Sequence, residues 1–164
     1  MSSRRFFAFV WVFILFLLQN FLAYLFPGKC PPLLLIAVIF YSLREGPRFG
    51  AVLGAGAGLL LELFWQGGFG FWPLNFAAVG ALSGYVSSKI FPDGLLTEIL
   101  LPGTAFYFST LAEIVYLQLQ TGTFSGWEAA GRAFLPWPFI GTLLISPVLF
   151  AWLQNVSSGR RWLR

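Results

Sequence analysis

The sequence predicts an all-α polytopic membrane protein, with about six transmembrane helices packed in one bundle. Of its 164 residues, 58% are hydrophobic and only 10% are charged, and the mean hydropathy is +0.79. A chain of this composition has too little polar surface for a soluble monomer. The apolar residues also fall into runs of roughly span length, separated by turns rich in glycine and proline.

Six apolar runs fill the chain. A membrane span needs roughly 20 apolar residues, so five or six spans leave no room for a separate soluble domain. Everything that the protein does must therefore happen in or beside the membrane. We predict a single transmembrane domain over residues 1–164, with spans at 6–26, 33–43, 48–65, 72–90, 95–119 and 139–154.

The first run predicts an uncleaved span. Arg4 and Arg5 precede it, as in a secretory signal, but no small-residue cleavage site follows and the run continues to Phe26. Gln19 and Asn20 lie in its outer half. Both should face protein or water, because an amide exposed to hydrocarbon costs several kcal/mol.

The second run, residues 33–43, is short for a span, because it reaches only about 17 Å as a helix. Three interpretations stay open. The helix starts directly at Pro31 and Pro32, or the bilayer thins around it, or the segment is partly re-entrant.

The third span carries glycines at four-residue spacing, which form one ridge without side chains on a helix. In lipid such a ridge matters because it lets another backbone approach closely. The fourth span, with two glycines at the same spacing and Asn75 near its outer end, is the candidate partner. The residues predicted to pack helices or bind partners are Gly46, Gly50, Gly54, Gly58, Glu62, Asn75, Gly80 and Gly84.

Two features are expected in the last third of the chain. Pro102 lies in the interior of the fifth span and predicts a kink. Ser125 and Glu128 fit a capping box, so residues 129–135 should form a short helix at the membrane surface.

Positive charges predict the orientation of the bundle. With six spans both termini lie on one side, and positive residues concentrate in cytoplasmic loops. We therefore expect both termini to be cytoplasmic. The eight inner residues are Arg4, Arg5, Arg44, Arg48, Lys89, Arg160, Arg161 and Arg164, and the two outer ones are Lys29 and Arg132.

The sequence offers little for catalysis. It has no histidine and one cysteine, Cys30, so the usual general base, metal-ligand spacings and an intrachain disulfide are missing. The net charge of +4 lies in short loops and at the ends, which fits topology better than nucleic-acid binding. We expect no enzyme activity, no metal and no cofactor.

Ionisable residues at membrane depth are the remaining candidates for function. Glu62 and Glu113, together with Gln19, make up a candidate intramembrane polar site. One interpretation is a proton relay or ligand contact. The other is structural, with the acids hydrogen-bonded to Asn75, Gln19 or a partner, which ties helices together. Four tryptophans fall toward the outer side, and they fit an interfacial belt and also the wall of a small-molecule cavity; they are Trp65, Trp72, Trp127 and Trp137.

Residues 46–88 resemble the signature of the rod shape-determining protein MreD family. The matching stretches are Glu45-Gly46-Pro47-Arg48-Phe49-Gly50, Gly54-x-x-x-Gly58-Leu59-Leu60-Leu61-Glu62, Gly67-Gly68-Phe69-Gly70, and Gly80 with Gly84. The family usually has Asp where this chain has Glu62, a conservative departure. Length and hydropathy resemble the family over the whole chain.

The resemblance implies a non-catalytic component of the elongation complex in the bacterial inner membrane, which directs peripheral peptidoglycan synthesis and maintains cell shape. The partners that it implies are MreC first, then RodA, a class B penicillin-binding transpeptidase and MreB, with lipid around the bundle. The family is also similar in fold to the S components of energy-coupling-factor transporters. The alternative function is therefore a vitamin-binding S component, with its ligand near Glu62, Asn75 and the outer tryptophans.

Overall fold

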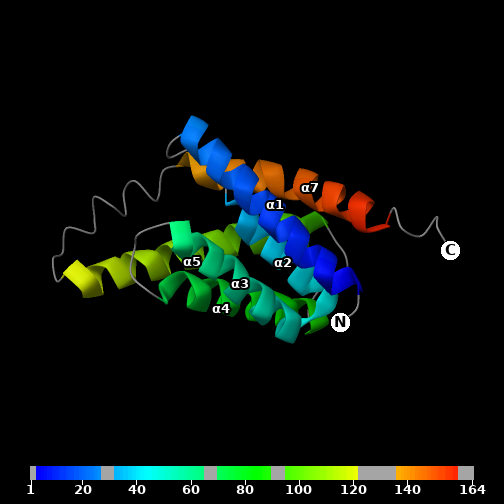
Figure 1. The fold of residues 1–164 in the computed structure, drawn as a ribbon, viewed down its shortest axis with the longest axis horizontal. Helices are drawn as coiled ribbons and strands as arrows, with labels where there is room; N and C mark the ends of the chain where they lie inside the picture. Colours follow the sequence, from blue (N-terminus) through cyan, green and yellow to red (C-terminus); the bar gives the residue numbers. More distant parts are fainter. Residues whose placement is uncertain (1–2, 27–31, 65–69, 90–94, 122–135, 159–164) are drawn as a thin grey trace.

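The structure, a computed structural model, describes residues 3–26, 32–64, 70–89, 95–121 and 136–158 (Figure 1). These residues form helices and contain no strand. Each of the six predicted apolar runs contains a helix. The helices are α1 (Ser3–Leu25), α2 (Leu33–Glu45), α3 (Pro47–Phe64), α4 (Phe71–Lys89), α5 (Leu95–Thr121) and α7 (Pro136–Ser158).

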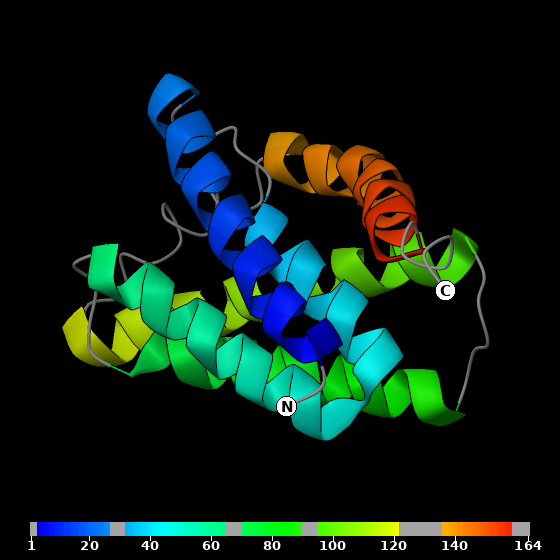
Figure 2. The same ribbon diagram turned by 45° about the vertical axis from the view of Figure 1, so that its right-hand side comes forward.

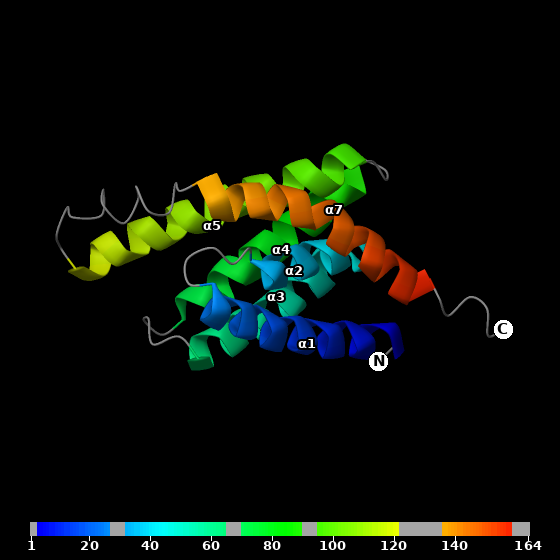
Figure 3. The ribbon, with the colours of Figure 1, turned by 90° about the horizontal axis from the view of Figure 1, so that it is seen from above.

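The helices stack as three layers of two. Figure 3 shows α1 with α3 on one side, α2 with α4 in the middle, and α5 with α7 on the other side. The middle layer therefore contacts both outer layers. This arrangement places α4 beside α2, with α3 on one face and α5 on the other. Most of the candidate functional residues lie where α4 meets α3 or α5.

The middle helix α2 is the core of the bundle. All ten residues from Leu33 to Ser42 are buried, and α1, α3, α4, α5 and α7 all contact the helix (Figure 2). A helix that is apolar all round is stable only when it is enclosed in this way. Phe40 shows the packing, since its ring meets that of Phe150 on α7 edge to face at 5.1 Å.

Of the three interpretations of the short second run, the structure agrees with a helix that starts at the prolines. Pro32 is the N-cap of α2, and the helix runs for 13 residues to Glu45. Its length is therefore about 20 Å, against roughly 30 Å of hydrocarbon in a bilayer. Gly46 ends the helix, and α3 begins at the next residue, Pro47, where proline suits a first helical position.

Three helices are long and apolar enough to span a membrane, namely Phe6–Leu25, Pro47–Phe64 and Ile99–Gln120. The length and hydropathy of the structure thus support three spans directly, while the predicted number is six. α2 is too short by itself, and the apolar part of α7, Phe139–Gln154, is shorter than a full span. α4 is long enough, but Asn75 and several serines make it more polar.

Some features that the sequence predicts are not tested by the structure. α5 continues through Pro102 as one helix, and the kink expected there stays a prediction. The short helix expected at residues 129–135 lies outside the described residues, as do Cys30 and the turn at residues 67–69.

Candidate functional site

The glycines of α3 lie directly on the backbone of α4. A Cβ atom added to Gly54 would lie 2.6 Å from the carbonyl carbon of Phe76, and one added to Gly58 would lie 2.5 Å from the Cα atom of Pro73. Real Cβ atoms do not approach other atoms closer than 3.0 Å. Any side chain at these positions must therefore push the two helices apart.

The contact continues toward the start of α3, where glycine meets glycine. A Cβ atom on Gly80 would lie 2.7 Å from the carbonyl carbon of Gly50. A Cβ atom on Gly50 would lie 2.5 Å from the carbonyl oxygen of Gly80 and 2.7 Å from the Cβ atom of Ser42 on α2. Gly50 therefore sits where three helices meet.

These contacts form one continuous antiparallel seam, which we call the glycine seam. Along it each step of four residues up α3 matches a step of about four residues down α4. The facing positions are Gly50 with Gly80, Gly54 with Phe76, and Gly58 with Trp72 and Pro73. At the second and third of these positions only α3 supplies glycine, and α4 presents its backbone.

Gly46 has a different role from the one that its spacing predicts. It lies before α3, has a φ angle of +91°, and donates its N–H to the carbonyl oxygen of Ser42 at 3.0 Å. A Cβ atom on Gly46 would meet nothing within 4 Å. At this end of the contact the close approach is instead at Gly84 of α4, where an added Cβ atom would lie 2.6 Å from the backbone nitrogen of Pro47. Gly46 is needed for its backbone conformation, and Gly84 for close approach.

Glu62 caps the start of α4 at the other end of the glycine seam. The backbone N–H of Gly70, immediately before α4, donates to the Oε1 atom of Glu62. A carboxylate at this place satisfies a helix-terminal N–H and faces the positive end of the helix dipole. The second oxygen, Oε2, is buried without a hydrogen-bond partner among the described residues.

Gln19 caps α2 in the same manner. Its Oε1 atom accepts a hydrogen bond of 2.8 Å from the backbone N–H of Leu34, in the first turn of α2. The N-cap residue of α2 is Pro32, which makes no side-chain hydrogen bond to cap the helix. The expectation that Gln19 faces protein is confirmed. Asn20 bonds instead to its own helix, donating to the carbonyl oxygen of Phe16 at 2.9 Å.

Asn75 joins α4 to α5 and does not contact Glu62 by any hydrogen bond that the described residues show. Its Nδ2 atom donates to the hydroxyl oxygen of Ser109 at 2.7 Å, and both residues are buried. The Oδ1 atom of Asn75 is buried without a partner among the described residues. The sequence prediction missed Ser109. A lone hydroxyl in an apolar run is its only sequence feature, and such residues often bond to their own helix.

Glu113 lies on the face of α5 that meets α4. It follows Ser109 by four residues and precedes Tyr116 by three, which places all three on one side of the helix. The ring of Tyr116 stacks on that of Phe71 at 4.6 Å with an interplanar angle of 23°. Glu113 is half-buried between these two contacts. We call this interface, with its hydrogen bond and its ring stack, the polar seam.

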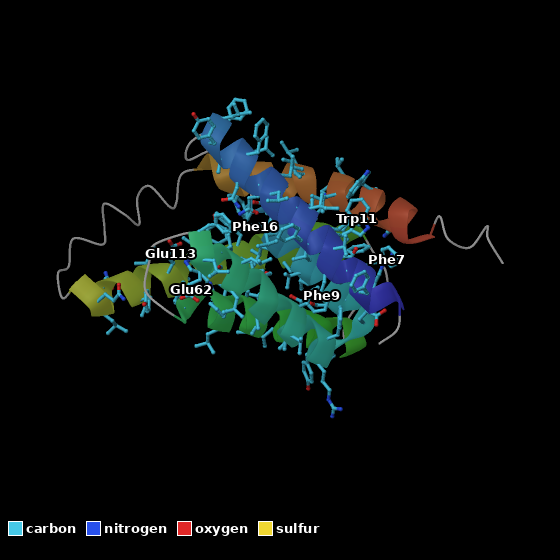
Figure 4. All side chains as sticks on the ribbon, viewed as in Figure 1. Phe7, Phe9, Trp11, Phe16, Glu62 and Glu113 are labelled. Carbon is cyan, nitrogen blue, oxygen red and sulfur yellow. The ribbon has the colours of Figure 1, made fainter. Side chains whose placement is uncertain are left out.

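The three residues of the predicted intramembrane polar site therefore work in separate places. Gln19 contacts α2, and Glu62 contacts the start of α4. Glu113 comes from α5, and Figure 3 shows that α4 lies between α3 and α5, the helices that carry the two acids labelled in Figure 4. Within the described parts of the chain, no hydrogen bond or ion pair links these three side chains.

The contacts given above for the described residues are mostly those of helices packed on one another. These residues include no cluster of three or more His, Cys, Asp or Glu side chains that could hold a metal ion. Trp72 packs against Phe71 and Phe76, with ring centroids 5.4 and 6.1 Å apart. Trp65 and Trp127, which the sequence places toward the outer side, lie outside the described residues.

Comparison with protein-family models, with curated proteins and with solved structures finds no match to this chain. The resemblances to MreD and to the transporter S components therefore stay predictions from the sequence.

Proposed function

We propose that this chain is a non-catalytic component of the bacterial elongation (rod) complex, working in the inner membrane by binding partner membrane proteins. The observation that carries the proposal is the stretch from residue 46 to residue 88. Its resemblance to the MreD signature includes Gly50, Gly54, Gly58, Gly80 and Gly84, and these five glycines pack α3 on α4 into one hairpin. Glu62, which replaces the usual Asp, supports the hairpin by capping α4.

The packing of the glycines limits where partners could bind in this proposal. Because α4 covers the ridge, MreC and the other expected partners, RodA, a class B penicillin-binding transpeptidase and MreB, would need other surfaces. α1 offers one. Its large exposed side chains include Phe13, Leu17, Phe21 and Tyr24, whose exposed fractions are 48, 52, 61 and 86%. Partners and lipid would share this apolar face.

Both termini are cytoplasmic in this proposal, because eight of the ten positive residues then lie inside. Labelling of single cysteines in intact cells tests the orientation, after Cys30 is replaced by serine. A cysteine at Ser125 should react with an impermeant reagent from outside, and a cysteine at Ser158 should react only after the membrane is opened. The reverse pattern would contradict the orientation.

Co-purification tests the function itself. The chain should be purified in mild detergent from its native cells, and the recovered proteins identified by mass spectrometry. We expect MreC and wall-synthesis enzymes for the wild type and for Glu62→Gln, which keeps a hydrogen-bonding side chain of the same size. A thermal-shift screen against vitamins is run beside it. A vitamin that stabilises the wild type but not Glu62→Gln, with no wall-synthesis protein recovered, would favour the transporter function and overturn the proposal.

A further inference from the structure

The polar seam between α4 and α5 contains a buried hydrogen-bond acceptor without a donor. Asn75 is 6% exposed, and its Nδ2 atom is used by Ser109. Its Oδ1 atom has no partner within the described residues. A buried amide oxygen left without a donor costs about 1–3 kcal/mol, so a donor is expected nearby.

Glu113 is the group placed to supply this donor. It lies between the two contacts of the polar seam, the hydrogen bond at Ser109 and the ring stack at Tyr116. Side chains on a helix lean toward its N-terminus. The carboxyl group of Glu113 therefore leans toward the turn of Ser109, where Oδ1 of Asn75 is located.

A carboxylate could not serve, because it only accepts hydrogen bonds, whereas a carboxylic acid also donates one. The neighbouring helices place no cation near Glu113. The stretches 95–121 and 136–158 contain no Lys, Arg or His, and the one cation of α4 is its last residue, Lys89. Glu113 faces the start of α4, at Phe71 and Asn75, so Lys89 is about 20 Å away along that helix. Arg44 and Arg48 lie where α2 ends and α3 begins, away from the end of α3 that meets the start of α4. The other titratable groups on α4, α5 and α7 are Tyr85, Glu98, Tyr107 and Tyr116, which are neutral or negative. An unpaired charge in such surroundings is strongly unfavourable.

We propose that Glu113 takes up one proton from water and, as a neutral acid, donates a hydrogen bond to the Oδ1 atom of Asn75, which clamps α5 onto α4. The proton stays on Glu113, and no covalent bond other than O–H forms or breaks. Loss of the proton would leave two acceptors facing each other and loosen the polar seam. The proposal needs no partner protein, so it stands or falls separately from the proposed function.

Infrared spectroscopy of the full chain in lipid vesicles tests the proton directly. The wild type should show the carbonyl band of a hydrogen-bonded carboxylic acid at neutral pH. Glu113→Gln should remove this band and keep the fold, because glutamine has the same size and still offers an N–H donor. Glu62→Gln, the matched control on α3, should leave the band in place.

The partner of the acid is tested in the same spectra. Asn75→Leu should shift the Glu113 band to the higher frequency of a free acid, and Asn75→Ala is the second variant if leucine prevents folding. If Glu113→Gln removes only carboxylate bands, then Glu113 is charged and the amide of Asn75 is turned the other way. That result, or an acid band already at the free frequency in the wild type, would overturn the proposal.

Discussion

The two faces of α4 hold their neighbours by opposite means. Along the glycine seam, α3 and α4 touch through backbone atoms, and there is no room for a single added carbon at Gly54 or Gly58. Along the polar seam, α4 and α5 touch through side chains, with one hydrogen bond and one ring stack. One interface depends on the absence of atoms, and the other depends on particular polar and aromatic groups.

The two kinds of interface are those expected for helices surrounded by lipid. Apolar side chains gain little by leaving lipid for protein, so helices are held by close van der Waals contact or by hydrogen bonds. The glycine seam uses the first means and tolerates no increase in size. The polar seam uses the second and tolerates changes in size better than the loss of a donor or acceptor. Substitutions should therefore rank differently on the two faces.

The largest effect is expected at the glycine seam. Gly54→Ala places a Cβ atom against the backbone of Phe76, which cannot rotate away, so we expect a loss of about 3 kcal/mol, the upper end of the overpacking range. The unfolding free energy, measured by SDS titration in mixed micelles with tryptophan fluorescence, checks this value.

Gly56→Ala is the matched control on the same helix. Its Cβ atom would meet only the ring of Phe9, at an ordinary distance of 3.6 Å. Alanine favours a helix over glycine by up to about 1 kcal/mol, so this variant should be neutral or more stable. If both alanines have the same effect, close backbone approach is not what holds α3 to α4.

The next largest effect is expected at Glu62, where the glycine seam ends in a polar contact. Glu62→Leu leaves the N–H of Gly70 without its acceptor and should cost about 0.5–2 kcal/mol, the range for the loss of a helix cap. Glu62→Gln keeps an acceptor oxygen and should be mild. The same unfolding assay applies to both. A leucine variant as stable as the glutamine variant would mean that the cap does not stabilise α4.

The smallest effect is expected at the polar seam. Ser109→Ala removes the hydroxyl that accepts from Asn75 and should cost about 0.6 kcal/mol, the average for an interhelical hydrogen bond in a membrane protein, and at most about 1.7 kcal/mol. Ser83→Ala is the control, because Ser83 is also buried but donates to its own helix, to the carbonyl oxygen of Val79 at 2.7 Å. Equal losses for the two serines would mean that the bond between α4 and α5 adds nothing specific.

Spacing in the sequence predicts the glycine seam well and the polar seam poorly. Glycines four residues apart mark a ridge whatever its partner is, and Gly80 with Gly84 indicates α4 as that partner. Gly46 follows the same spacing, yet its place before Pro47 gives it a turn conformation that spacing alone does not distinguish. Periodicity thus predicts which residues share a face of a helix. The ends of the helix have to be located first, because a residue beyond the end, such as Gly46, does not belong to that face.

The polar contacts depend on which helices lie side by side, and a single sequence does not contain that information. One interpretation of the sequence has the two acids hydrogen-bonded to Asn75, Gln19 or a partner, but the hydrogen bond that Asn75 makes is to Ser109, 34 residues away. Glu62 and Gln19 each bond to a backbone N–H at the start of the following helix. Backbone groups at helix ends are present in every sequence and leave no pattern, so caps from a preceding helix are difficult to predict.

The burial of α2 has a consequence for how the chain enters the membrane during synthesis. A helix of 13 residues is about 20 Å long and cannot cross roughly 30 Å of hydrocarbon alone. In the finished protein its residues from Leu33 to Ser42 are covered by other helices and do not face lipid. α2 therefore reaches a stable position only after later helices, α3 and α4 among them, have been synthesised and packed against it. Until then Gln19 of α1, already synthesised, is the residue that can hold its first turn.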